Sequence, residues 1–323
     1  MPGPINPGRT FRRQQDKKGG ESAEGQAGHS EIGGIMDLFR TAAAALFAAA
    51  AATFARSEYE KRHFVTETFE ISSDKLRTPE RNLVFLSDLH SNEFGEENER
   101  LLRAIDGIRP DAVLIGGDMM VCKKGKLDLT VCLNLVERLA SKYPVYYANG
   151  NHEERMNRER EHYGDCYDRF REALERAGVI YLSDRSACVG EDLRITGCNM
   201  KERYYRHRFT VPQMEEGELE RRVGKADRER FQILMLHSPL FFDCCRRWGA
   251  DLTLCGHFHG GTIRLPLLGG IMTPQYQFFL PWCAGRFDRE KKTMIVSRGL
   301  GTHSINIRLN NKPQLVHIRL KGR

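Results

Sequence analysis

The stretch Leu83–His90 reads Leu-Val-Phe-Leu-Ser-Asp-Leu-His. Its first four residues are apolar, as in a strand that is buried on both faces, and residues that can bind a cation follow at once. Residues two apart in an extended chain point to the same side, so Asp88 and His90 can face one common site. The stretch therefore predicts a buried strand that ends at a functional site.

The same arrangement recurs four more times along the chain. The residues at the five strand ends are Asp88 and His90, Asp118, Asn151 and His152, His237, and His257 and His259. In open α/β sheets the carboxyl ends of the strands form the ligand crevice, so all five groups can meet there. Glycines beside them, such as Gly117 and Gly256, permit tight turns and close backbone approach. Five polar strand ends of one chemical kind predict a single site.

From Phe64 onward, short apolar runs alternate with amphipathic helical stretches, which is typical of an α/β domain. The predicted strands cover residues 65–71, 82–86, 112–115, 145–148, 179–182, 193–196, 232–236, 252–255, 293–296 and 314–320. The predicted helices include residues 97–108, 127–139 and 165–177. We expect one catalytic domain over residues 58–323.

The N-terminal part has a different composition. Residues 1–35 are rich in Gly, Gln, Ser and charge, which predicts a disordered extension. Residues 36–57 contain an alanine-rich apolar run, 41–55, that is shorter than the roughly 20 residues needed to cross a bilayer. We interpret it as a signal or anchor segment that associates the protein with a membrane. The alternative is a soluble alanine-rich helix on a cytoplasmic protein.

The charge and the cysteine content of the chain limit which binding partners and which covalent cross-links are expected. The net charge of +7 arises from 50 basic residues interleaved with 43 acidic ones, which suits anionic substrates or a membrane surface and gives no sign of specific nucleic-acid binding. The nine cysteines form no Cys-x-x-Cys pair, and an odd number cannot all pair. We expect free thiols.

The order of the motifs, Asp-x-His, Gly-Asp, Gly-Asn-His, His and Gly-His-x-His, resembles the calcineurin-like metallophosphoesterases over about residues 82–320. The sequences from Gly256 to Pro266 and from Ser297 to Gly301 are similar to a bacterial membrane-associated phosphodiesterase branch, such as UDP-2,3-diacylglucosamine pyrophosphatase-like proteins. The resemblance implies a four-layer αββα sandwich of two mixed sheets flanked by helices.

The resemblance also implies two divalent metal ions and their ligands. One ion would be held by Asp88, His90, Asp118 and His259, and the other by Asp118, Asn151, His237 and His257. Asp118 would bridge the two, and His152 would be a catalytic residue that donates a proton rather than a ligand. Oxygen and imidazole ligands without thiolate favour Mn, Fe, Zn or Co. Glu153 stands where the family often has Asp, which leaves open whether it orients His152.

The implied activity is hydrolysis of a phosphodiester or pyrophosphate bond by a metal-bridged hydroxide. The substrate would be a phosphorylated small molecule or a lipid-linked compound, such as a nucleotide-linked lipid, a glycerophosphodiester or a phospholipid. The same ligands also serve phosphomonoesterases and protein phosphatases, which are the first alternative. A non-catalytic metal-binding scaffold is the second.

Two further segments bear on specificity. Lys201–Arg208 mixes basic and aromatic residues, which favours either a binding loop for a phosphorylated head group or a solvated surface loop. Leu265–Trp282 carries many apolar side chains between prolines and glycines. It predicts either an apolar flap that touches lipid or a segment packed against the domain's own core.

Overall fold

The structure is a computed structural model that describes residues 23–125, 127–302 and 305–323, with the backbone alone for residues 23–35 and 37. The chain divides into a first unit, residues 1–52, and a second unit, residues 53–323. In its described part the first unit consists of helix α1 (Ala23–Lys61), whose last turns belong to the second unit. The disordered extension over residues 1–35 stays a prediction: α1 includes residues 23–35, and residues 1–22 lie outside the described residues.

Helix α1 contains the predicted apolar segment. Its part Leu38–Lys61, 24 residues with a mean hydropathy of 1.6, is long and apolar enough to cross a membrane, judged by length and composition. This stretch is longer than the alanine-rich run 41–55, since the helix continues beyond both ends of that run. Whether this segment anchors the protein stays a prediction.

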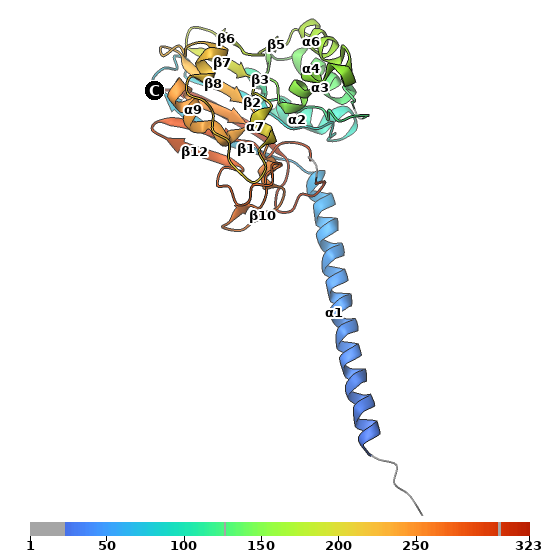
Figure 1. Cartoon of the computed structure of the whole chain (residues 1–323). Coiled ribbons are helices and arrows are strands. Elements are labelled where there is room, and N and C mark those ends of the chain that lie inside the picture. The colour runs from blue at the N-terminus through green and yellow to red at the C-terminus, as the bar shows by residue number, and fades with distance from the viewer. Residues whose placement is uncertain (1–22, 126, 303–304) are drawn as a thin grey trace, which may run out of the picture. The chain divides into compact units, whose positions relative to one another are not determined.

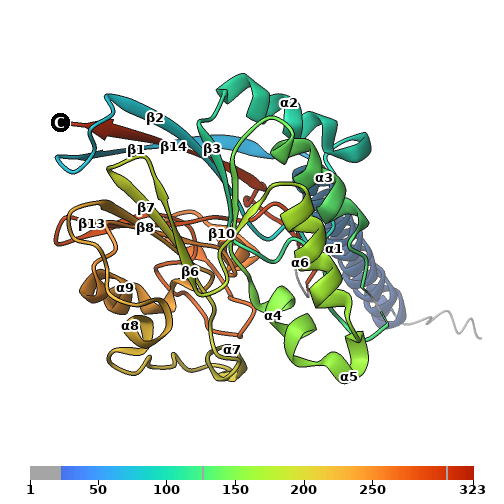
Figure 2. The same cartoon turned by 90° about the horizontal axis from the view of Figure 1, so that it is seen from above.

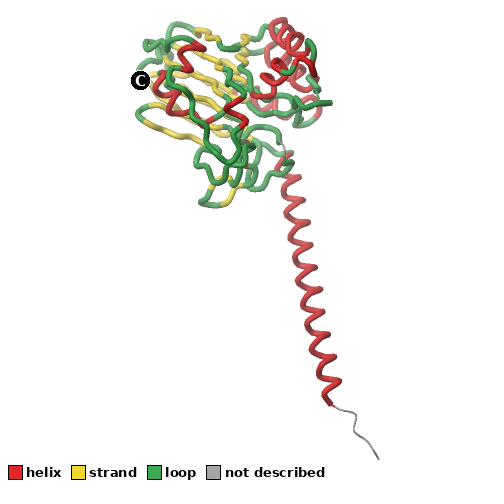
Figure 3. Tube along the Cα trace, in the orientation of Figure 1, coloured by secondary structure: helices red, strands yellow, loops and turns green. Residues whose placement is uncertain are grey.

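The second unit contains two mixed sheets (Figures 1 and 3). The first sheet has the order β1 (Val65–Ser73), β14 (Gln314–Gly322), β2 (Glu80–Leu86), β3 (Ala112–Ile115), β4 (Val145–Tyr147) and β5 (Ile180–Tyr181). Strand β14 runs parallel to β1 and antiparallel to β2, whereas β2, β3, β4 and β5 are parallel.

The second sheet has the order β12 (Gly285–Arg289), β13 (Lys292–Val296), β9 (Leu252–Cys255), β8 (Phe231–Leu236), β7 (Leu193–Cys198) and β6 (Arg185–Val189). Its four central strands are parallel, and the edge strands β12 and β6 are antiparallel to their neighbours. A small hairpin of β10 (Arg264–Leu265) and β11 (Gly269–Gly270) stands apart from both sheets.

Four layers follow from where the strands bury their side chains. Leu83 and Phe85 of β2 pack between the two sheets, while Val84 and Leu86 pack on the other face under helices, as the alternation along a strand requires. The first sheet is covered by α2 (Glu99–Ile108), α3 (Thr130–Ala140) and α6 (Cys166–Arg176), and the second by α7 (Arg203–Arg206), α8 (Glu218–Val223) and α9 (Phe242–Trp248) (Figure 2). The predicted αββα sandwich is confirmed.

Shorter helices lie in the connections between these elements. They are η1 (Glu96–Asn98), α4 (Asn151–Arg158), α5 (Arg160–Tyr163), η2 (Pro239–Phe241) and η3 (His259–Gly261). Helix α4 follows β4 and η3 follows β9, so both begin beside the predicted site. All nine cysteines lie within the described residues and carry free thiols, as predicted.

Candidate metal centre

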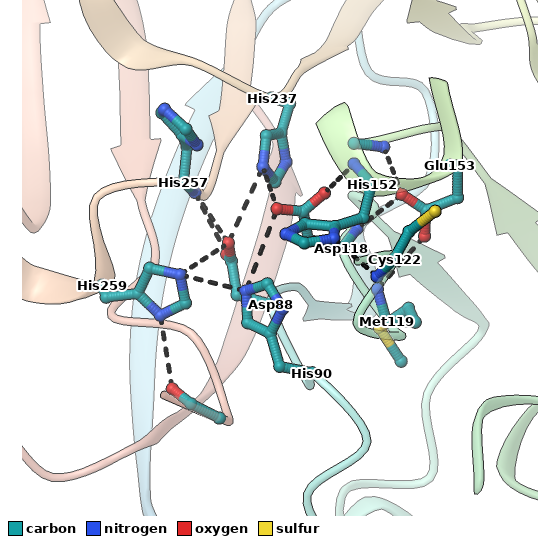
Figure 4. A network of polar contacts seen from close by, with 12 residues as sticks. Asp88, His90, Asp118, Met119, Cys122, His152, Glu153, His237, His257 and His259 are labelled. Atoms are coloured by element: carbon teal, nitrogen blue, oxygen red, sulfur yellow. Dashed lines mark hydrogen bonds and ion pairs between the residues drawn. The ribbon is translucent and has the colours of Figure 1, made fainter. Parts of the chain in front are cut away.

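The five strand ends meet at one place in the second unit (Figure 4). The predicted residues follow β2, β3, β4, β8 and β9, which supply Asp88 and His90, Asp118, Asn151 and His152, His237, and His257 and His259, respectively. All eight side chains belong to buried residues. The structure therefore brings together residues that are up to 171 positions apart, from Asp88 to His259.

Two groups of donor atoms lie side by side. In the first group, His259 Nε2 lies 3.4 Å from Asp88 Oδ1 and 3.2 Å from His90 Nε2. In the second group, His237 Nε2 lies 3.2 Å from Asp118 Oδ2, and His257 completes a set whose donor atoms are all within 4.8 Å of one another. The distance of 3.8 Å between Asp118 Oδ2 and His90 Nε2 joins the two groups.

The donor set fits divalent cations. Among the described residues, the two buried carboxylates form ion pairs with histidines alone. They attract positive charge strongly, because burial removes the water that would otherwise solvate them. The amide oxygen Oδ1 of Asn151 is also buried and accepts no hydrogen bond from the residues that the structure describes, a state that costs about 1–3 kcal/mol unless a cation or another donor satisfies it. Oxygen and imidazole atoms in this arrangement are the ligands that Mn, Fe, Zn and Co accept.

The backbone is strained where the donors converge. Asp88, His90, Asp118, His257 and His259 all have φ values between 47° and 67°, in the left-handed region that residues other than glycine rarely adopt. Each such residue costs roughly 1–3 kcal/mol and persists only where its surroundings impose it. The tight turns after β2, β3 and β9 aim these side chains at the site.

Two glycines make the convergence possible. A Cβ atom added to Gly117, whose φ is 84°, would lie 1.9 Å from the backbone nitrogen of Gly150. A Cβ atom added to Gly256 would lie 2.1 Å from Asp88 Oδ2. Close backbone approach at both positions, expected from the sequence, is thus confirmed.

Backbone carbonyls set the tautomers of two histidines. His237 Nδ1 donates to the carbonyl of Gly116 at 2.8 Å, and His259 Nδ1 donates to the carbonyl of Gly301 at 3.3 Å. A carbonyl oxygen can only accept, so each ring leaves Nε2 toward the carboxylates, the tautomer that metal binding requires.

His152 has the opposite arrangement. Its Nδ1 accepts a hydrogen bond from the backbone N–H of Cys122 at 2.8 Å, which places the proton of the neutral ring on Nε2. Burial lowers the pKa of His152, although the nearby charge of Asp118 opposes the shift. The ring lies within 4.8 Å of donor atoms of His90 and Asp118, and a role as proton donor rather than ligand stays a prediction.

Glu153 has a role that the sequence left open. Its carboxylate accepts hydrogen bonds from the backbone N–H groups of Asp118, Met119 and Gly150 at 2.9–3.1 Å, and from the hydroxyl of Tyr147 at 2.7 Å. Burial, and then the charge of Asp118, raise the pKa of Glu153. Glu153 therefore fastens the Asp118 turn to the start of α4.

The charges of the site act on one another. Burial by itself lowers the pKa of His237, but the negative charges of Asp118 and Asp88 outweigh it and raise that pKa to about 10. Burial raises the pKa of Asp88 to about 6 against the influence of His237. The carboxylates thus favour positive charge beside them.

Three residues near the site were not predicted from the motifs. Arg308 is fully buried, and its guanidinium donates to the carbonyls of Arg298 at 2.8 Å and Gly301. Asn311 Nδ2 donates to the carbonyl of His259 at 2.7 Å. The ring of Tyr205, from the basic and aromatic segment, packs edge-on against His257 with centroids 5.0 Å apart. Arg308 and Asn311 stand in a loop without periodicity, so no sequence signal marked them.

Comparisons with known proteins agree with this geometry. The family model for calcineurin-like phosphoesterases matches residues 81–261. Phosphodiesterase YaeI of Escherichia coli (strain K12) is 25% identical over 241 residues, which cover 74% of this chain and 81% of YaeI.

Two relatives in Bacillus subtilis (strain 168) are similar at the same level. The uncharacterized protein YpbG is 25% identical over 293 residues, covering 89% of this chain and 97% of YpbG. The uncharacterized metallophosphoesterase YkoQ is 24% identical over 241 residues, covering 72% and 81%. Because the family match spans more than half of the chain and contains every residue of the candidate centre, the chain belongs to the calcineurin-like phosphoesterases and is a metal-dependent phosphoric ester hydrolase.

Proposed function

We propose that this chain is a dinuclear phosphodiesterase that hydrolyses a phosphodiester or pyrophosphate bond. The observation that carries the proposal is the position of Asp118. Its Oδ2 lies 3.2 Å from a nitrogen of one histidine group and 3.8 Å from a nitrogen of the other. A single carboxylate between two sets of donors suits two cations about 3.5–4 Å apart.

The ligand sets follow from the two groups. Asp88, His90 and His259 would hold one ion, and Asn151, His237 and His257 the other, with Asp118 shared. Divalent Mn, Fe, Zn or Co in these positions would neutralise charge on the phosphoryl oxygens and favour a water-derived nucleophile near neutral pH. The strained turns and the carbonyl contacts of His237 and His259 preorganise the donors, so little rearrangement is needed on binding.

The chain itself supplies proton donation. His152 holds its proton on Nε2, at the edge of the ligand groups, and would donate it to the leaving oxygen. The hydrogen bond from Cys122 to Nδ1 fixes the ring and maintains this tautomer. Glu153 holds the Asp118 turn and would act as a positioning residue.

Two observations favour a diester over a monoester. A relative similar over three quarters of this chain bears the name phosphodiesterase. Helix α1 has the length and composition of a membrane-spanning helix, and we propose that it anchors the enzyme beside membrane-linked phosphodiesters. The natural substrate is proposed to be a phosphorylated small molecule or a lipid-linked compound.

The test compares bis(p-nitrophenyl) phosphate with p-nitrophenyl phosphate, using the full-length chain in detergent. The protein is stripped of metal with a chelator and then supplied with Mn, Fe, Zn or Co. We expect metal-dependent cleavage of the diester in preference to the monoester, lost in His237→Ala. Preference for the monoester would indicate a phosphomonoesterase instead. Two bound ions without turnover of either ester would favour a non-catalytic metal-binding scaffold.

A further inference from the structure

Large apolar side chains are exposed on one part of the second unit. We define the apolar rim as Leu267, Leu268, Phe278, Phe279, Ile305 and Ile307. Leu267 is fully exposed, and Phe278 and Phe279 are 53% and 54% exposed. Single exposed apolar residues are ordinary on a protein surface, but a contiguous group marks an interaction site.

Backbone contacts show that the rim is one surface. Leu267 and Leu268 form the tip of the β10–β11 hairpin, in which Leu265 pairs with Gly269. The backbone of Phe279 donates to Ile271, and Met272 pairs with Phe278, so the two phenylalanines lie beside this hairpin. The isolated bridge between Ile263 and Leu309 brings the segment with Ile305 and Ile307 to the same place.

A small pocket opens between these two segments. Met272, Pro274 and Tyr276 line it from one side, and Ile305 and Ile307 from the other. His259 of the metal centre also lines this pocket. The rim therefore adjoins the catalytic site.

The last turns of α1 are attached to the same segment. The hydroxyl of Ser57 accepts a hydrogen bond from the backbone of Arg308 at 3.1 Å, and Lys61 donates to the side chain of Asn306 at 3.1 Å. Asn306 lies between the two isoleucines of the rim. Glu60 is fully buried, and its carboxylate accepts from the backbone of Asn311 at 2.8 Å.

This attachment limits how far a bilayer can be from the rim. The alanine-rich part of α1 ends at Ala55, and Ser57 is already buried in the second unit. At 1.5 Å per residue, the two positions differ by only about 3 Å along the helix. A membrane that contains the alanine-rich part must therefore end close to the segment 305–307.

Basic side chains border the rim. The guanidinium of Arg208 lies over the ring of Tyr276 at 5.6 Å, and Phe209 stacks on the same ring with centroids 5.9 Å apart. Arg62 follows the last turn of α1. Cations around an apolar patch suit the interface of a bilayer with anionic lipids.

We propose that the apolar rim docks onto the lipid bilayer that contains α1, with Leu267, Phe278 and Phe279 inserted at the boundary between head groups and acyl chains. The proposal rests on the membrane anchoring proposed above and adds a second point of attachment. Docking in this way holds the mouth of the pocket beside His259 at the membrane surface, where the phosphate groups of lipids lie.

The test places a fluorescent side chain on the rim of the full-length protein. Phe279→Trp and, separately, Leu267→Trp are reconstituted into vesicles of phosphatidylcholine and phosphatidylglycerol, with and without brominated acyl chains. We expect the added tryptophan emission, taken as the difference from the parent protein, to shift to shorter wavelength and to be quenched by the brominated lipid. Ile180→Trp is the matched control, because Ile180 is an exposed apolar residue on β5, away from the rim, and should show neither change.

Hydrolysis of bis(p-nitrophenyl) phosphate in the same samples reports on folding and on the proposed activity independently of docking. Unquenched emission from both rim variants in proteins that co-float with the vesicles would overturn the proposal. A shift that depends on protein concentration instead of on brominated lipid would replace the bilayer by a second copy of the chain. Failure of the full-length protein to co-float would also overturn it, whereas loss of diester cleavage with quenching intact would count against the proposed activity alone.

Discussion

The metal centre and the apolar rim depart from the usual distribution of side chains in opposite directions. The metal centre buries two carboxylates and five histidines, groups that normally remain in water unless they are paired. The rim exposes leucines and phenylalanines that normally lie in a core. Both groups of residues lower the stability of the fold, so the rest of the domain must offset their cost.

The two regions also differ in how well the sequence predicts them. Buried polar residues were marked in the sequence, because each follows an apolar strand and the strands end together. Exposed apolar residues were ambiguous, because the segment Leu265–Trp282 has the composition of a core loop and of a surface flap alike. The structure resolves the ambiguity by residue: Trp282 is half-buried and packs on the core, whereas Leu267 and Phe279 are exposed.

The largest effect is expected for Asp118→Asn, which removes the charge that both ligand groups share. We expect diester turnover to fall by at least about 10²–10³-fold, the loss that follows removal of one preorganised electrostatic stabiliser. Bound metal, measured by atomic emission, should fall as well. Asp106→Asn, on a surface residue that pairs with Lys142, should leave both unchanged; parent-level metal and turnover in Asp118→Asn would contradict the bridging role.

His152→Gln separates proton donation from metal binding. We expect metal content to stay at the parent level, while turnover falls about 10²–10⁴-fold for a diester with a poor leaving group. The loss should be smaller for a p-nitrophenyl ester, since that leaving group needs little protonation. His317→Gln on β14 is the control, and an equal loss for both esters, or a loss of metal, would argue against donation.

Glu153→Gln tests the positioning of the Asp118 turn. One carboxylate oxygen would become an amide that faces backbone N–H donors, so we expect the free energy of unfolding to fall by roughly 2–4 kcal/mol. Urea denaturation measures the change. Glu154→Gln is matched, because Glu154 receives a hydrogen bond from Asn149 alone among the described contacts, and it should cost no more than about 1.5 kcal/mol. An equal decrease in the free energy of unfolding for both variants would show that the four hydrogen bonds to Glu153 do not stabilise the fold more than the single one to Glu154.

The smallest effect is expected for Phe279→Ser. An exposed side chain contributes little to the core, so the free energy of unfolding should change by no more than about 0.5 kcal/mol, and turnover of the soluble diester should remain at the parent level. Phe170→Ser on α6, where the ring is fully buried, should destabilise by about 3 kcal/mol or more in the same urea titration. A large loss for Phe279→Ser would place this ring in the core.

Much of the architecture could be predicted from the sequence. All ten predicted strands are present within two residues of their predicted bounds, because continuous apolar runs mark the central parallel strands and alternating apolar residues mark β1 and β14. The edge strands β6 and β12 were missed, since Arg185–Val189 and Gly285–Arg289 mix polar and small residues on exposed edges. Helix α4 was missed because Met156 is its single large apolar residue.

The sequence predicts the candidate metal ligands, but it does not predict the residues that hold them in position. Each ligand candidate stands next to a strand end, which is a local signal. Arg308 and Asn311 reach the site through hydrogen bonds to carbonyls of Gly301 and His259, and such contacts depend on how two distant loops meet. The role of Glu153 likewise depends on a turn that lies 35 residues earlier in the chain.

The position of β14 has a consequence for biosynthesis. Thr68 of β1 pairs with His317 of β14, 249 residues later, and β14 separates β1 from β2 in the first sheet. At 5–20 residues per second, the ribosome needs roughly 10–50 s to make that intervening chain. During this time β1 and β2 each carry an unpaired edge that invites wrong pairing. The nascent protein is thus open to chaperones until its final strand inserts between the first two.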